Sequence, residues 1–380
     1  MTSKERVHLA LQRQPTDRVP IFMWFHPKTT KRLGNLLEIP AKYVPLAMGD
    51  DIRQAWVSNN HAMEGIIHEH DGESHVDDWG IEWIRIDGFN QISKYPLAET
   101  NEQQLLQYRF PYDRIEALVN LMKPVMKFKD DYFTGCDVSP CVFEMYWRLR
   151  GMEKTLMEFA SNPDLTQEML RRSTEFSVAL SEEACQQFDL DWLWLGDDAA
   201  GQQSMLMSPD TWRQMVKPFL KQNAEVGKRH GLYVAFHSCG AIRSIIEDLI
   251  EIGVDVLNPI QCNCPGMNPL ELKKEFGKKL AFMGGVDTQG ILPNGTAYQV
   301  RKATAELLEG MSTYGGGYIF AASHTIPPET PDDNIFAMYD EAGISREEIF
   351  DRAANIRTSL RPSEHGLIDN AEHDESDRSI

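Results

Sequence analysis

A histidine and a cysteine two residues apart close one apolar run of this sequence. In LYVAFHSCG, His237 and Cys239 follow the run and precede a glycine. Residues i and i+2 of an extended strand face the same side, so both side chains can point at one ion. Imidazole nitrogen and thiolate sulfur are ligands that Zn²⁺ prefers, and a catalytic zinc uses three protein ligands. The alternative is that Cys239 is a small buried hydrophobe and His237 a core histidine, because an H-x-C pair alone is a weak pattern.

A third ligand has to come from another part of the chain. His324 is the best candidate because it closes a later apolar run, YIFAASH. Cys262 and Cys264 in QCNCPG are the alternatives, since they lie just past the intervening run. A set of three would leave the fourth position of the zinc open to a substrate.

Further polar residues close other apolar runs in the same way. They are Glu144 in VFEMYW, Asp197 and Asp198 in LWLGDD, Asn258 and Gln261 in VLNPIQ, and Asp287 in MGGVD. In a barrel of parallel strands, the carboxyl ends of the strands carry the reactive groups. We therefore predict Glu144, Asp197, Asp198 and Asp287 as catalytic residues, and Asn258 and Gln261 as cofactor-binding residues.

Several of these residues have a structural alternative. Asp197 or Asp198 would orient or protonate a substrate, but Asp198 could instead cap the next helix, and only one of two adjacent strand residues can point inward. Asp287 would bind a substrate or start a helix. Gln261 would lie near the metal or only close a turn. Glu144 would supply a carboxylate, and a buried glutamate needs a partner.

A second group of histidines precedes an alternating segment. His68, His70 and His75 in HEHDGESH have the residue types of metal ligands, but they do not close a core strand. We interpret them as solvated or helix-surface residues. Trp192 and Trp194 alternate with apolar residues in DWLWLG and are predicted to lie in the core.

Short apolar runs alternate with helix-like segments along the chain. The runs are RVPIFMWF, DDYFTGCDVSPCVFEM, LDWLWLGDDAA, LYVAFHSCG, GVDVLNPIQ, KLAFMGGVDTQ and GGYIFAASHT. Between them, segments such as IRSIIEDLIEIG and AYQVRKATAELLEG place apolar residues at three- and four-residue spacing. This alternation predicts a parallel sheet covered on both faces. The short repeat from 190 to 345, without a dinucleotide-binding glycine fingerprint, favours a (β/α)8 TIM barrel over an open sheet.

Three other segments complete the predicted architecture. HVDDWGIEWIRIDGFNQISKYPL alternates polar with aromatic and β-branched residues, which predicts an inserted antiparallel β-hairpin. The N-terminus, MTSKERVHLALQRQ, is charged and amphipathic and predicts a helical segment. We expect residues 1–360 to form a single domain and residues 361–380, which are polar and acidic, to be a disordered tail.

Composition restricts the partners and the location. The net charge of −19 argues against nucleic acid and against an anionic membrane, because both would repel the surface. A small molecule or a protein partner remains. No apolar run of about 18 residues is present, so we expect a cytoplasmic protein. Six cysteines in 380 residues indicate reduced thiols rather than a disulfide framework.

Several blocks, in order, resemble the uroporphyrinogen decarboxylase superfamily and, within it, the cobamide-dependent methyltransferases. They are KERVHLALQRQPTDRVPI, HVDDWGIEW, HSCG followed by LIEIGVDVLNPIQ, MGGVDTQGILPNGT, and GGGYIFAASHTIPPETPDDNIFAMYDEA. The resemblance covers nearly the whole chain and implies a (β/α)8 barrel.

The resemblance also implies an ion. In the coenzyme M methyltransferases of this family, zinc is held by an H-x-C pair, here His237 and Cys239, and by a later cysteine. His324 occupies that later position in SHTIPPETP, so the set keeps a zinc ligand but has one thiolate fewer. This departure argues against the thiol-methylating activity more than against the metal.

The function implied is methyl transfer with a corrinoid on a partner protein as co-substrate. The small-molecule substrate would be a thiol, a methoxy or methylthio compound, or tetrahydrofolate, and the direction of transfer stays open. A decarboxylase or lyase is the alternative, but the MRQAGRY-like block of the decarboxylases is replaced by FMWFHPKTTKRLG. A non-catalytic small-molecule-binding barrel is the third hypothesis. The resemblance to the superfamily also suggests a homodimer.

Overall fold

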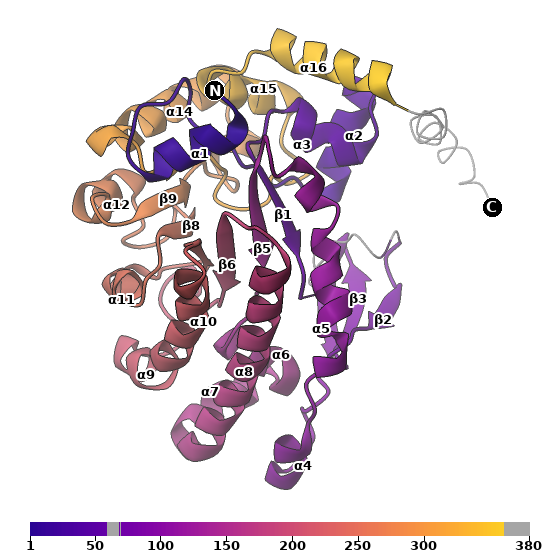
Figure 1. Ribbon diagram of the computed structural model, residues 1–380, viewed down its shortest axis with the longest axis vertical. Coiled ribbons are helices and arrows are strands. Elements are labelled where there is room, and N and C mark those ends of the chain that lie inside the picture. Colours follow the sequence, from indigo (N-terminus) through magenta and orange to yellow (C-terminus); the bar gives the residue numbers. More distant parts are fainter. Residues whose placement is uncertain (59–67, 69, 361–380) are drawn as a thin grey trace, which may run out of the picture. The chain divides into compact units, whose positions relative to one another are not determined.

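The computed structural model describes residues 1–58, 68 and 70–360 (Figure 1). The chain forms two compact units: residues 52–283, and residues 3–51 together with the chain from 284 onward. That residues 1–360 form one domain stays a prediction, and the predicted tail at 361–380 lies outside the described residues.

The 52–283 unit is built on parallel strands that neighbour one another in chain order. Their order is β1 (Ile52–Trp56), β5 (Phe133–Asp137), β6 (Trp192–Gly196), β7 (Tyr233–His237), β8 (Val256–Ile260) and β9 (Ala281–Gly284). β1 pairs with β5, β5 with β6, β6 with β7 and β7 with β8, all in parallel. Every residue of β5, β6 and β8 is buried, as expected for strands covered on both faces.

Helices connect these strands in the alternating order that the sequence predicts. They are α4 (Glu102–Gln107), α5 (Ile115–Val119), α6 (Phe143–Arg150), α7 (Met152–Ser161), α8 (Pro163–Gln187), α9 (Pro209–Met215), α10 (Lys217–Arg229), α11 (Ile246–Glu251) and α12 (Pro269–Phe276). Short 3-10 turns lie at Tyr112–Arg114, Asn120–Met122, Val125–Phe128 and Arg243–Ile245. α8 packs along α10, as Figure 1 shows.

Local residue choice explains where these helices begin. The Asn162 side chain accepts the Leu165 N–H, and Pro163 occupies the first turn of α8, where no N–H is needed. Asn268 and Pro269 start α12 in the same way.

Trp192 and Trp194 lie in the core as predicted, at 0% and 1% exposure. The Trp192 indole passes so close to β5 that a Cβ on Gly135 would lie 1.8 Å from Nε1, so only glycine fits there. The same indole N–H donates to Gln54 Oε1 of β1 at 2.8 Å. β1 was not predicted, because IRQAW contains no apolar run.

The predicted antiparallel insertion is confirmed and has three strands. β2 (Ser74–Val76), β3 (Glu82–Ile86) and β4 (Phe89–Lys94) form a separate antiparallel sheet in the 52–283 unit. Asp77 supports the turn between β2 and β3, because its Oδ1 accepts the N–H groups of Trp79 and Ile81.

Up to residue 360, the second unit contains one short strand and mostly helices. Its elements are α1 (Ser3–Leu11), α2 (Pro27–Leu37), α3 (Val44–Ala47), α13 (Ile291–Asn294), α14 (Ala297–Met311), β10 (Tyr318–Ile319), α15 (Asp332–Glu341) and α16 (Arg346–Ser359), with 3-10 turns at Ala41–Tyr43 and Thr313–Gly315. α1 confirms the predicted N-terminal helical segment. The run RVPIFMWF is not a continuous strand; it makes parallel bridges from Ile21 to Phe320 and from Phe25 to Ile326.

Buried ion pairs tie the start of this unit together. Arg6 and Arg18 both donate to the fully buried carboxylate of Asp51, at 2.6 and 2.7 Å. Asp51 Oδ2 also accepts the Ile21 N–H at 2.8 Å. The chain entering the first bridged segment is thereby fixed by charge-assisted hydrogen bonds.

All six cysteines are free thiols, as predicted. Among the described helices, none combines the length and the hydropathy that crossing a bilayer requires.

Candidate metal centre

β7 places His237 and Cys239 on the same side, as the sequence predicts. His237 is the last residue of β7, and the intervening Ser238 is buried while His237 and Cys239 are half-buried. His237 Nε2 and Cys239 Sγ are 3.5 Å apart. A tetrahedral zinc with bonds of about 2.1 Å to nitrogen and 2.3 Å to sulfur would separate its ligand atoms by about 3.6 Å. The pair therefore fits this ion without rearrangement.

Asn258 orients the His237 ring. The two residues are register partners on β8 and β7, and His237 Nδ1 lies 2.7 Å from Asn258 Oδ1. Because the amide oxygen only accepts, the proton resides on Nδ1 and the Nε2 lone pair faces Cys239. A metal-binding histidine is usually held by such a partner on its other nitrogen. Asn258 thus contacts the predicted ligand, at 2% exposure.

The surroundings of the Cys239 thiol favour its neutral form. Burial, and to a smaller extent the negative charges of Asp198 and Glu144, raise the pKa of this thiol well above its ordinary value. A nearby cation would be needed to stabilise the thiolate. The site is therefore suited to a metal that displaces the proton rather than to a free thiolate nucleophile.

The turn after Cys239 requires a glycine. Gly240 has φ +88°, and a Cβ there would lie 2.5 Å from the Gly201 carbonyl oxygen. Its N–H donates to Gln261 Oε1 at 2.8 Å, while the Gln261 carbonyl accepts the Cys264 N–H. Gln261 therefore contacts the loop of the predicted ligands and closes a turn, and the cofactor-binding roles of Gln261 and Asn258 stay predictions.

Asp198 contacts the same loop from β6. Its Oδ1 accepts the Cys239 N–H at 2.8 Å and lies 3.9 Å from His237 Nε2. The side chain is 36% exposed, so one carboxylate edge stays open to solvent beside the pair. The alternative that Asp198 caps the next helix is wrong, because that helix, α9, begins at Pro209 with Ser208 as its cap.

Asp197 and Asp198 both follow β6, and the Asp197 side chain contacts different groups from those of Asp198. It is fully buried, and its carboxyl oxygens accept the N–H groups of Val142, Phe143 and Glu144 at 3.2, 3.3 and 2.8 Å. Burial raises its pKa to about 7. These contacts support a capping role at the start of α6, and a catalytic role for Asp197 stays a prediction.

Glu144 lies in the first turn of α6 and not at a strand end, so its predicted element was wrong. VFEMYW forms a helix because Asp197 accepts the free N–H groups of its first turn. Glu144 Oε1 accepts from Arg148 at 2.5 Å and Oε2 accepts the Asp198 N–H at 3.0 Å. Arg148 was not predicted; its signal in the sequence is its i+4 spacing from Glu144 on one helix face.

His324 and Asp287 lie in the other unit. His324 follows β10, is exposed, and makes an edge-on ring contact with Trp24 at 6.2 Å. Asp287 Oδ1 accepts the Gln289 N–H, which supports the turn before α13. Their two loops are linked, because Thr288 Oγ1 lies 3.1 Å from Ser323 Oγ. A ligand role for His324 and a substrate role for Asp287 stay predictions, as do Cys262 and Cys264 as alternative ligands.

The interpretation of the second histidine group as a surface feature was wrong for His68. This residue is 4% exposed, its Nδ1 lies 2.9 Å from Asn90 Oδ1, and its Nε2 lies 3.0 Å from His75 Nδ1. His70 is exposed, as expected. The antiparallel sheet covers His68, and the sequence spacing contains no signal for that packing.

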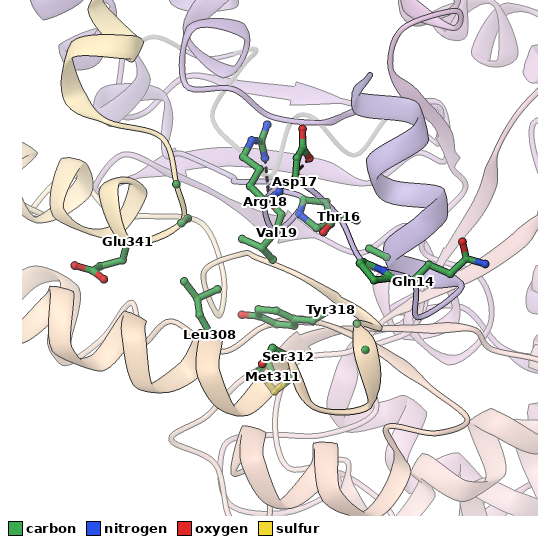
Figure 2. Close-up of a pocket in the computed structure, with 17 residues that line it drawn as sticks. Gln14, Thr16, Asp17, Arg18, Val19, Leu308, Met311, Ser312, Tyr318 and Glu341 are labelled. Carbon is green, nitrogen blue, oxygen red and sulfur yellow. Dashed lines mark hydrogen bonds between the residues drawn. The ribbon is translucent and has the colours of Figure 1, made fainter. Parts of the chain in front are cut away.

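A cavity of about 540 Å³ lies elsewhere, in the unit that contains β10 (Figure 2). It is lined by Val19, Leu308, Met311 and Tyr318, with Asp17 at its edge. Tyr318 is the first residue of β10, so the cavity lies at the amino end of that strand. Reactive groups of barrel enzymes lie at the carboxyl ends, and none of the residues predicted for the site lines this cavity.

Comparison with known proteins identifies a family and a fold. A family model described as uroporphyrinogen decarboxylase (URO-D) matches residues 133–343. A methylated-thiol–coenzyme M methyltransferase from Methanosarcina mazei is 21% identical over 206 residues, covering 53% of this chain and 52% of the relative. The chain thus spans about half the length of that curated relative.

A solved structure described as a methyltransferase from Methanosarcina mazei has the same fold. It matches with a TM-score of 0.67 at 19% identity and covers 90% of this chain and 98% of that chain. Together with the parallel strands in chain order, this likeness confirms the predicted (β/α)8 barrel class.

Proposed function

Because the chain belongs to the uroporphyrinogen decarboxylase family and resembles methyltransferases within it, we propose that it is a zinc-dependent methyltransferase. The methyl group would move between a corrinoid carried by a partner protein and a small molecule such as a thiol, a methoxy or methylthio compound, or tetrahydrofolate. A cytoplasmic location and a homodimer stay predictions.

One observation carries the proposal. His237 Nε2 and Cys239 Sγ lie 3.5 Å apart, with the histidine tautomer held by Asn258 in the form that binds a metal. A partner on the second ring nitrogen is what metal-bound histidines usually have. Zinc, when bound, supplies a Lewis acid that lowers the pKa of a bound thiol or polarises an ether oxygen.

We propose His324 as the third ligand. Each of the three residues offers one ligand atom of a type that zinc binds. A His–Cys–His set carries one thiolate, so the centre would be more electrophilic than one with two. A more electrophilic centre favours activation of a methyl donor. We therefore do not assume that the acceptor is a thiol.

The protein's own residues have separate parts in this proposal. Asn258 orients the His237 ring, and Asp198 and Gln261 hold the backbone of the loop that carries Cys239. The exposed edge of the Asp198 carboxylate is available to orient a substrate beside the pair. Cys239 must lose its proton when the ion binds.

Metal analysis tests the first step. Purified protein should contain about one zinc per chain, and His237→Ala and Cys239→Ala should each lose it while keeping their circular dichroism spectrum. His324→Ala should lower the zinc content, whereas Cys262→Ala and Cys264→Ala should not. A well-folded protein that takes up no zinc on reconstitution contradicts the proposal.

Turnover tests the second step. The protein is incubated with methylcobalamin and a panel of thiols or tetrahydrofolate, and in the reverse direction with cob(I)alamin and methoxy or methylthio donors. The cobalt(I) absorbance should appear or disappear with one member of the panel. Activity in neither direction would favour the decarboxylase or the binding-protein alternative.

A further inference from the structure

Two carboxylates join the end of β6 to the start of α6 in opposite directions. Asp197, just after β6, accepts the N–H groups of residues 142–144, and Glu144 in turn accepts the Asp198 N–H at 3.0 Å. The second oxygen of Glu144 is held by Arg148 at 2.5 Å, with both side chains less than 10% exposed. The backbone between Asp197 and Asp198 is therefore fixed on both sides.

The fixed backbone directs the Asp198 side chain toward Cys239. Asp198 Oδ1 accepts the Cys239 N–H at 2.8 Å, so a continuous path runs from Arg148 through Glu144 and Asp198 to the residue that carries the thiol. Each link is a hydrogen bond to a charged group, the stronger class of hydrogen bond in proteins.

We propose that Glu144 is a positioning residue of the metal centre, acting through Asp198 on the backbone of Cys239. The inference rests on the proposed function. It assigns Glu144 a role other than the catalytic one that its sequence predicts, because one of its oxygens accepts from Arg148 and the other accepts the Asp198 N–H. Its loss would let the Asp198 backbone move and would release the Cys239 N–H.

A purely structural role for Glu144 is the competing explanation, since a buried ion pair broken on one side destabilises any fold. Asp191 provides a matched control. It is a buried carboxylate in the same unit, it accepts the N–H and the hydroxyl of Thr134 at 2.8 and 3.2 Å, and it precedes β6 instead of following it. Asp191→Asn should therefore lower stability without reaching the metal centre.

The experiment measures amide hydrogen exchange at Cys239 in metal-free protein and zinc affinity in loaded protein. In metal-free protein, Glu144→Ala should speed hydrogen exchange of the Cys239 amide by about tenfold, as expected for loss of one stable hydrogen bond. In the loaded protein, zinc affinity by chelator competition should fall by about 10- to 100-fold. The absorption bands of the Co²⁺-substituted protein should also shift.

Further variants keep the test decisive. Glu144→Gln should give smaller changes, because its amide oxygen can still accept the Asp198 N–H. If Glu144→Ala does not fold, Asp198→Ala tests the last link and should accelerate exchange of the same amide. Wild-type exchange rates and zinc affinity in Glu144→Ala, or equal changes in Asp191→Asn, would overturn the proposal. Lack of zinc in the wild-type protein would instead refute the proposed function, while the exchange measurement would still decide the role of Glu144.

Discussion

Replacing Asn258 with alanine should weaken zinc binding without unfolding the protein. Asn258 Oδ1 is the acceptor for the His237 ring at 2.7 Å, and it fixes the proton on Nδ1. Without this acceptor, metal-free His237 can carry its proton on Nε2 instead. Zinc would then have to force the proton back to Nδ1, where no carboxamide oxygen accepts it.

The magnitude follows from that unpaired donor. A buried donor without a partner costs about 1–3 kcal/mol, and about 1.4 kcal/mol corresponds to a factor of ten in affinity. We therefore expect zinc affinity to fall by about 10- to 100-fold, the range usual for partners of metal-bound histidines. Asn258→Asp keeps an acceptor at this position and should bind zinc at least as tightly as Asn258→Ala.

The assay combines zinc competition with the ¹⁵N chemical shifts of His237, which report the tautomer in the metal-free protein. Asn268→Ala is the matched control, because Asn268 caps α12 and should lose about 1 kcal/mol of stability with no effect on zinc. Unchanged zinc affinity in Asn258→Ala, with the tautomer still on Nδ1, would falsify the assignment of Asn258.

Three other outcomes are expected. Because burial raises the pKa of the Cys239 thiol, zinc must displace the thiol proton when it binds. Zinc affinity in competition assays should therefore rise up to about tenfold per pH unit between pH 6 and 8. An affinity independent of pH would contradict this expectation. Burial raises the pKa of Asp197 to about 7 from an ordinary 3.8, so the folded protein holds a proton there that the unfolded chain releases. The contribution of Asp197 to the free energy of unfolding should therefore fall as the pH rises from 4 to 7. Asp197→Asn should remove this pH dependence in chemical denaturation. Replacing a glycine at positive φ by alanine costs roughly 1 kcal/mol of stability. Gly231→Ala, at φ +72° with open space around the added Cβ, should lower the free energy of unfolding by that amount, and the crowded Gly240→Ala by more. Equal losses would show that the crowding at Gly240 is relieved.

Much of the fold was predictable because its signals are local. The apolar runs around Trp192, Val234 and Val256 became β6, β7 and β8, since fully buried parallel strands leave a continuous apolar pattern. β1 was missed because IRQAW mixes charged with apolar residues and is identified only by its pairing with β5. The assignment of Glu144 to a strand end failed for a related reason: its helix depends on N–H acceptors supplied by Asp197, 53 residues away from it in sequence.

For the candidate site, the sequence by itself determined that His237 and Cys239, the predicted ligand pair, face one side. Two residues at i and i+2 on a strand face the same side, and a histidine and a cysteine there can bind one ion whatever surrounds them. The tertiary structure decided what orients that pair. The His237 ring contacts Asn258, the Cys239 N–H donates to Asp198, and Glu144 accepts the Asp198 N–H. Only the register of β7 on β8, and the hydrogen bonds between the chain after β6 and the start of α6, bring these residues together. Local periodicity extends over a few residues, whereas these contacts join segments 21 to 54 residues apart, so no spacing in the sequence could predict them.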